Sequence, residues 1–355
     1  MRKWMTNLMI FLPGFCLMTM SAESKNCKLD IGAGYRQDHL EWEIGGPANV
    51  PKVMSKLTWK NIRIFDVEAQ FRKITCQNIY FRANADYGWI FDGENRDSDF
   101  RVEEGKQSTR KTVEYSRSDN KASKGGVYDA SAGLGYFIRM CMGSRQLRFA
   151  PIGGYSIHEQ HLRLFKGFQT IDLNYPVYEG HHFPGLKSSY NARWYGPWAG
   201  LDTYCHFNDE ITLSGTFEYH WLHFHGKGHW NLREDILGDF IQTGFGRGYF
   251  GTIALDYNFC SGWYMGALCK FNYAKIENGR DKTVVCIPMD TNIKSYYRKS
   301  KTTKLKQSTK SQLSQESPID ANDHNQSFLT FDTVTKLRNV RWYSFSFIFT
   351  VGYNF

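Results

Sequence analysis

The sequence predicts an all-β chain that folds as a ten-stranded antiparallel transmembrane β-barrel. Three observations predict it: segments that alternate with period two, short turns that alternate with long loops, and a strongly aromatic composition in a polar chain. Aromatic residues make up 16% of the 355 residues, yet the mean hydropathy is −0.50. A protein of spanning helices would be far more apolar, whereas in a membrane barrel only alternate side chains of each strand face lipid.

The last segment, 342–355, shows the period-two pattern most strictly. Every second side chain in it is apolar, and most of these are aromatic. They are Tyr343, Phe345, Phe347, Phe349, Val351, Tyr353 and Phe355. Because successive side chains of a strand point to opposite faces, we expect a strand with this face in lipid. An edge strand of a soluble sandwich is the alternative for this segment taken alone.

The first 22 residues are typical of a secretory signal peptide. Arg2 and Lys3 give a basic start, an apolar stretch extends to Met20, and small Ser21 and Ala22 precede a polar sequence. We therefore expect residues 1–22 to be removed. Residues 23–355 would then form the barrel, as a multi-pass protein of the bacterial outer membrane.

Ten segments fit strands, in chain order. They are 28–43, 55–73, 79–89, 127–142, 147–158, 192–207, 210–224, 249–259, 263–275 and 342–355. Long loops are expected at 92–125, 161–188, 226–244 and 278–341, and they alternate with short turns. Outer-membrane barrels have short periplasmic turns and long outer loops. Both chain ends are therefore expected on the periplasmic side.

The last long loop, at about 279–340, contains a basic low-complexity segment, 294–315. Such a composition favours an exposed, disordered segment. It would attract anionic lipopolysaccharide, sulphated glycans or acidic partners on a host surface. A solvated tether without a partner is the alternative. The net charge of +9 owes much to this loop and does not indicate nucleic acid, which an exported barrel would not meet.

The inward positions of the predicted strands carry charges of both signs. Those expected to form a packed polar network in the lumen are Asp66, Glu68, Arg72, Arg82, Asp86, Glu218 and His220. The same faces also carry Asp129, Arg139, Asp202, Asp256 and Lys270. Because the lumen of ten strands is narrow, side chains are expected to fill it. A small channel is the alternative.

Eight cysteines occur, of which Cys16 leaves with the signal peptide. Five of the others lie near the predicted periplasmic rim and are candidates for disulfides: Cys27, Cys76, Cys141, Cys205 and Cys260. Exported thiols meet an oxidising compartment. Cross-links to cysteine-rich envelope proteins, pairing within the chain and idle free thiols all remain open, and a band that stays monomeric on non-reducing gels of alkylated cells would exclude the cross-links. Cysteine and histidine spacings do not indicate a zinc site. No metal or other cofactor is expected, with lipopolysaccharide as the candidate structural lipid.

Four short stretches resemble the omptins, which are ten-stranded outer-membrane proteases and adhesins. They are Ser55-Lys56-Leu57-Thr58-Trp59-Lys60, Gly88-Trp89, Gly215-Thr216-Phe217-Glu218-Tyr219 and the terminal Gly-Tyr-Asn-Phe. The architectural resemblance covers nearly the whole mature chain, and it is greatest to the divergent omptin-fold proteins of chlamydia-like bacteria. It implies an Asp-x-Asp pair and an Asp-x-His pair that face each other across the mouth and activate a water for cleavage near basic residues.

Asp97 and Asp99 stand where the resemblance puts the Asp-x-Asp pair. Counting onward from 215–219, the Asp-x-His positions fall on His229 and Asn231, so this pair is not recognisable. The candidate catalytic residues are therefore Asp97, Asp99 and His229. His223 and His225 share one face of a strand and form a weaker alternative, as metal ligands.

The preferred interpretation is a non-enzymatic envelope component or adhesin that presents large surface loops. The incomplete catalytic set favours it. An omptin-type endopeptidase and a small channel are the alternatives.

Overall fold

The computed structural model describes residues 27–46, 50–103, 105, 111–142, 145–288 and 328–355. The predicted signal peptide, 1–22, and the basic segment, 294–315, lie outside the described residues. Within the described part the chain is nearly all β, with fourteen strands in one sheet and a short 3-10 turn, η2 (Pro176–Tyr178). No helix in these ranges is long and apolar enough to cross a membrane.

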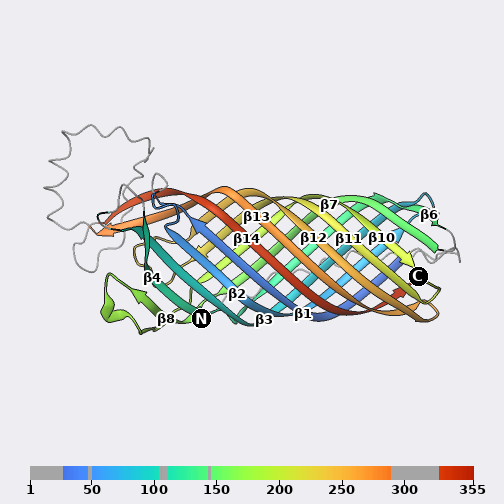
Figure 1. Cartoon of the computed structure of the whole chain (residues 1–355), viewed down its shortest axis with the longest axis horizontal. Helices are drawn as coiled ribbons and strands as arrows, with labels where there is room; N and C mark the ends of the chain where they lie inside the picture. Colours follow the sequence, from blue (N-terminus) through green and yellow to red (C-terminus); the bar gives the residue numbers. More distant parts are fainter. Residues whose placement is uncertain (1–26, 47–49, 104, 106–110, 143–144, 289–327) are drawn as a thin grey trace, which may run out of the picture.

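Ten of these strands form a closed antiparallel ring, which Figure 1 shows as an elongated barrel of tilted strands. They are β1 (Cys27–Ile44), β2 (Ser55–Ile74), β3 (Ile79–Val102), β5 (Gly125–Tyr136), β7 (Arg145–Arg163), β10 (Ser189–His206), β11 (Ile211–His229), β12 (Phe240–Cys260), β13 (Trp263–Pro288) and β14 (Phe328–Asn354). The ring closes where β1 pairs with β14, from Lys28 opposite Asn354 to Ile44 opposite Leu337. Closure removes every sheet edge within the barrel wall. The predicted ten-stranded barrel is thereby confirmed.

Strand β14 shows how the alternation meets two different environments. Its inward residues Ser344, Ser346 and Ile348 are buried in the lumen. The intervening Phe345 and Phe349 are 49% and 65% exposed on the outer wall, as expected for side chains that face lipid.

The remaining strands lie at the two ends of the barrel (Figure 1). β6 (Ile138–Met142) continues the line of β5 along β7, next to the short turns. At the other end, β4 (Thr112–Lys121), β8 (Phe165–Asp172) and β9 (His182–Phe183) extend the sheet outward from β3. We call β4, β8, β9 and the outer part of β3, residues 94–102, the outer sheet.

The outer sheet corrects the expectation of irregular loops at 92–125 and 161–188. The loop expected at 278–341 is also shorter, because β13 continues to Pro288 and β14 begins at Phe328. Stretches such as 94–99 and 116–121 are polar on both faces, as expected for strands that rise above the lipid. They therefore lack the apolar alternation by which a membrane strand is recognised. Backbone pairing with neighbouring strands holds them in the sheet instead.

A register irregularity near Asn61, whose φ is 53°, changes which residues of β2 face inward. Ile62 and Ile64 are buried on one side of it, and Leu57 and Trp59 on the other. β3 has a matching irregularity between its pairs with Ile64 and Lys60. Extra residues in paired strands shift the alternation by one position. As a consequence, the outer part of β3 turns its odd-numbered residues inward.

Two groups of buried apolar side chains fill the barrel at different depths. The larger group, here called the outer apolar core, occupies the half next to the outer sheet and includes Leu40, Trp42, Leu57, Trp59, Tyr190, Trp194, Phe224, Phe250, Ile276 and Trp342. The smaller group, the inner apolar cluster, lies toward the short turns and consists of Tyr80, Phe137, Ala150, Ile152 and Trp198. A polar layer lies between them.

Candidate functional site

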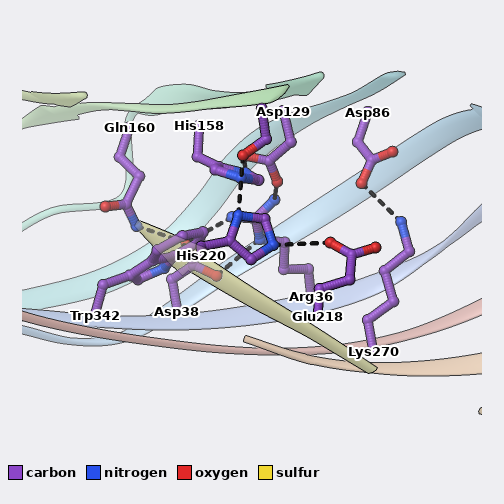
Figure 2. A network of polar contacts seen from close by, with 11 residues as sticks. Arg36, Asp38, Asp86, Asp129, His158, Gln160, Glu218, His220, Lys270 and Trp342 are labelled. Carbon is purple, nitrogen blue, oxygen red and sulfur yellow. Dashed lines mark hydrogen bonds and ion pairs between the residues drawn. The ribbon is translucent and has the colours of Figure 1, made fainter. Parts of the chain in front are cut away.

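The polar layer is organised around Arg36 of β1, which is buried in the lumen. Its guanidinium donates hydrogen bonds from Nε to Asp38 Oδ1 at 2.8 Å and from Nη2 to Asp38 Oδ2 at 3.0 Å. Nη1 donates to Asp129 Oδ2 of β5 at 2.6 Å. Figure 2 shows the two carboxylates on this single guanidinium. The planar, forked donor set of arginine suits such paired recognition.

Asp38 also connects this centre to distant strands. Its Oδ2 accepts a hydrogen bond from Gln160 Nε2 of β7 at 2.6 Å and one from the Trp342 indole Nε1 of β14 at 3.1 Å. On the other side, Asp129 Oδ1 lies 3.1 Å from His158 Nδ1. The network therefore ties β1, β5, β7 and β14 together across the lumen (Figure 2).

A second cluster surrounds Arg82 of β3. Its Nη1 donates to Asp202 Oδ1 of β10 at 2.6 Å, and its Nη2 donates to Glu218 of β11. The other oxygen of Glu218 lies 2.8 Å from His220 Nε2. Asp202 also accepts a hydrogen bond from the Tyr80 hydroxyl at 2.8 Å. This cluster fixes β3 against the opposite wall.

His220 also contacts Ser156, because its Nδ1 lies 3.1 Å from Ser156 Oγ. The order of serine, imidazole and carboxylate in Ser156, His220 and Glu218 is that of a nucleophilic triad. Ser156, however, is only 1% exposed and does not line the lumenal cavity described next. A substrate carbonyl has no path to its hydroxyl, so this arrangement acts as a structural hydrogen-bond chain.

Lys270 of β13 completes the polar layer. Its ammonium lies 2.8 Å from Asp86 Oδ2 and also pairs with Glu68. Beside it is a cavity of about 80 Å³ whose wall includes Glu68, Asp86, Ser131 and Lys270. A space of this size accommodates several water molecules.

The structure places all seven residues predicted for the lumenal network inside the barrel. Arg72 pairs with Asp30 at 2.6 Å, and Arg82, Glu218, His220, Glu68 and Asp86 have the partners given above. Asp66 differs: it is 0% exposed, and neither carboxylate oxygen has a hydrogen-bond partner among the described residues.

Sequence reasoning did not include Arg36, Asp38, His158 or Gln160 in this network. A signal was present in the first strand, because Leu29, Ile31, Ala33 and Tyr35 point outward and so assign Arg36 and Asp38 to the inside. Their partners lie on strands 93 and 122 residues away in sequence. Only the closed ring brings those strands together.

The candidate catalytic residues Asp97 and Asp99 lie on the outer part of β3, above the barrel. Both are half-buried and face inward because of the register irregularity in β2 and β3. Burial and the adjacent Asp99 raise the pKa of Asp97 well above its usual range, although the positive charge of Arg233 acts in the opposite direction. Burial also raises the pKa of Asp99. Arg233 therefore faces this aspartate pair. It also forms an ion pair with Asp235 at 2.7 Å.

The raised pKa values predict that the outer sheet is most stable in mild acid. A carboxyl whose folded-state pKa is raised holds its proton more tightly when folded, so stability decreases as pH rises from about 4 through the folded pKa. We expect the exchange protection factors of residues 94–102 to fall by up to about tenfold per pH unit in that window. Hydrogen exchange, corrected for intrinsic rates, measures this fall. The slope should weaken in Asp97→Asn and persist in Glu94→Gln, whose exposed side chain pairs with Lys60. A flat profile in the unaltered chain would contradict the prediction.

The structure does not bring His229 together with the two aspartates. His229 ends β11 on its outer face and is 54% exposed, and its Nδ1 lies 3.0 Å from Asp239 Oδ1. Gly228 and Phe224 occupy inward positions of the same strand. His223 also faces outward, where its ring stacks on Tyr195 with a centroid separation of 5.3 Å. No three described histidine, cysteine or carboxylate side chains converge to hold a metal ion.

No disulfide within the chain is formed among the cysteines whose side chains are described, and the cross-links to envelope proteins stay a prediction. These cysteines are Cys27, Cys76, Cys205, Cys269 and Cys286, and all five are free thiols. Cys76 is exposed in the turn between β2 and β3, on the side expected to face the periplasm. The side chains of the other two candidates, Cys141 and Cys260, lie outside the described set.

Comparisons with known proteins agree with this architecture. The structure is similar to the crystal structure of the outer membrane protease OmpT from Escherichia coli, with a TM-score of 0.65, 14% sequence identity and coverage of 95% of this chain and 99% of that one. The translocator domain of the autotransporter NalP from Neisseria meningitidis also matches, with a TM-score of 0.31, 11% identity and coverage of 94% and 90%. The first similarity supports the omptin-type barrel, and the second is too weak to support an argument.

The family comparison is more specific. No curated protein matches the chain. Residues 30–307 match the profile of the family described as Pom, Protochlamydia outer membrane protein. The matched range covers most of the chain, and the predicted resemblance to outer-membrane proteins of chlamydia-like bacteria is confirmed. This chain belongs to the Protochlamydia outer membrane protein family and is a multi-pass β-barrel of the outer membrane.

Proposed function

We propose that the chain is a non-enzymatic envelope component or adhesin, which presents the outer sheet and its loops at the cell surface. One observation carries the proposal: apolar side chains fill the outer half of the lumen, while the strands continue beyond it. A filled barrel offers its partners only the surface that it displays outside. The outer sheet is such a surface, and Leu173, Tyr175 and Val177 next to β8 are exposed on it.

The outer apolar core argues against the channel alternative. An ion that crossed the barrel would have to pass Trp59, Trp194 and Trp342, each 0% exposed. Transfer of an unpaired charge into such a layer is strongly unfavourable. We therefore expect no conductance steps from the purified full chain in planar bilayers. Steps that persist after removal of the loops would favour the channel.

The arrangement of the outer carboxylates argues against the endopeptidase alternative. Asp97 and Asp99 face Arg233, while His229 lies on the outer wall with Asp239. A general base must reach the attacking water, and the imidazole of His229 is not directed to the aspartate side. We expect a peptide with paired basic residues to stay intact in the presence of lipopolysaccharide. Cleavage that disappears in Asp99→Ala would establish the endopeptidase.

A deletion tests the display function directly. Arg163 at the end of β7 pairs with Ser189 at the start of β10, so a short Gly-Ser turn can replace residues 165–187 without disturbing the ring. We expect cells that carry this variant to attach less to host-cell monolayers than cells with the full chain, at equal surface levels. Equal attachment of the two would contradict an adhesin role for this part of the outer sheet.

A further inference from the structure

The polar layer contains more buried carboxylates than cations. Nine carboxylates belong to it: Asp30, Asp38, Asp66, Glu68, Asp86, Asp129, Asp202, Glu218 and Asp256. Five lysine and arginine side chains face them: Lys28, Arg36, Arg72, Arg82 and Lys270. Arg139 and Arg148 lie opposite each other on β6 and β7, nearer the short turns, and do not line the cavity. The layer therefore has an excess of negative charge.

The ion pairs show where this excess lies. Lys28 and Arg72 each serve one carboxylate. Arg36, Arg82 and Lys270 are each shared by two. His158 and His220 contact the second carboxylates on Arg36 and Arg82, which are Asp129 and Glu218. The group formed by Asp66, Glu68 and Asp86 holds three carboxylates and one paired cation, Lys270, so two negative charges remain there.

This group lies on adjacent positions of β2 and β3. In the register of the two strands, Glu68 lies opposite Asp86, and Asp66 lies opposite Gly88. Both Asp66 oxygens and Asp86 Oδ1 are buried without a hydrogen-bond partner among the described residues, as is Ser131 Oγ. Glu68, Asp86 and Ser131 line the cavity of about 80 Å³, and Asp66 is not part of its lining. Buried polar atoms normally have partners, so Asp86 Oδ1 and Ser131 Oγ, which are free beside this space, can take a ligand from it.

We propose that this wall of the lumen binds one hydrated divalent cation of the Mg²⁺ class, beside Glu68 and Asp86, with the charge of Asp66 two residues from Glu68 on β2. A divalent ion matches the two uncompensated charges, whose burial without a counter-charge is strongly destabilising. Three protein ligands do not converge among the described residues. Mg²⁺ accepts this situation, because it commonly keeps several waters and uses only one or two carboxylates. The cavity provides the space for those waters.

A cation titration of the full mature chain, refolded in detergent without lipopolysaccharide, tests the site. The unfolding temperature is measured at pH 7.5 in MgCl₂, with NaCl controls at equal ionic strength and EDTA as the reference. We expect a saturable increase of about 5 °C with MgCl₂ and none with NaCl. Equilibrium dialysis should find one Mg²⁺ per chain, a readout that needs no variant.

Two substitutions assign the binding to this wall. Asp86→Asn should abolish the Mg²⁺ response, because it replaces a carboxylate of the cavity wall. Asp66→Asn should unfold in EDTA at a higher temperature than the unaltered chain, because it removes an uncompensated charge. The matched control Asp92→Asn changes an exposed carboxylate that pairs with Arg63 and should keep the full response. If Asp86→Asn does not fold, Glu68→Gln takes its place. Equal unfolding temperatures in MgCl₂ and NaCl, absence of bound Mg²⁺, or a response that persists in the variant of the cavity wall would each overturn the proposal.

Discussion

Replacing Arg36 by methionine is expected to destabilise the barrel by about 3–5 kcal/mol, because the substitution leaves two buried carboxylates without their cation. Asp38 and Asp129 both depend on this guanidinium, at 2.8 Å and 2.6 Å. Their mutual repulsion in a poorly hydrated lumen adds to the loss of the hydrogen bonds. Urea unfolding of the refolded chain in detergent, followed by circular dichroism, measures the change.

Two controls separate the charge effect from a packing effect. Arg36→Met combined with Asp38→Asn and Asp129→Asn removes the stranded charges and should recover most of the lost stability. Arg63→Met breaks an exposed pair with Asp92 at 3.3 Å and should cost less than about 1 kcal/mol. A cost for Arg36→Met as small as that for Arg63→Met would show that the network does not hold the barrel together.

Replacing Trp342 by alanine is expected to cost about 3–5 kcal/mol, because it opens a cavity in the outer apolar core. The indole is 0% exposed and packs near Trp194, Phe250 and His158, with ring centroids 6.1, 5.7 and 5.6 Å away. The same urea experiment measures the effect. Trp342→Phe loses the hydrogen bond to Asp38 and part of the ring volume but keeps much of the packing, so it should cost clearly less than the alanine variant.

Phe349→Ala is the matched control on the same strand. Phe349 is 65% exposed on the outer wall, where lipid or detergent can occupy the space that its ring leaves. Its removal should therefore have a much smaller effect than removal of Trp342. Similar costs at the two positions would contradict a densely packed lumen.

The barrel wall could be predicted from sequence because its two environments impose opposite demands on neighbouring residues. In β14, lipid requires Phe345 and Phe349 on one side, and the narrow lumen favours Ser344 and Ser346 on the other. The outer part of β3 has no such contrast. Its residues are polar on both faces, and its strand conformation depends on pairing with β2 and β4, which a local pattern does not reveal.

The candidate site was harder to predict for two physical reasons. The irregularity at Asn61 moves Asp97 and Asp99 to the inner face, and no residue type marks it in the sequence. Counting onward from the motif at 215–219 selected His229. In β11, however, alternate side chains face inward, and His229 falls on the outward-facing set. The charged lumenal residues could be recognised one by one, whereas their pairing required the ring closure that brings Arg36 to Asp129.

The hydrogen bond between Asp38 and Trp342 joins positions 304 residues apart in the chain, and its consequence is kinetic. The interior cannot become fully packed until the last strand has paired with the first. Long-range contacts of this kind slow folding, and contacts that form after the rate-limiting step mainly control how fast the native state opens. Once β14 has closed the ring, separating it from β1 requires the lumen to lose its packing at the same time. Packing in the lumen therefore stabilises the β1–β14 pairing that closes the barrel, which favours a long-lived native state.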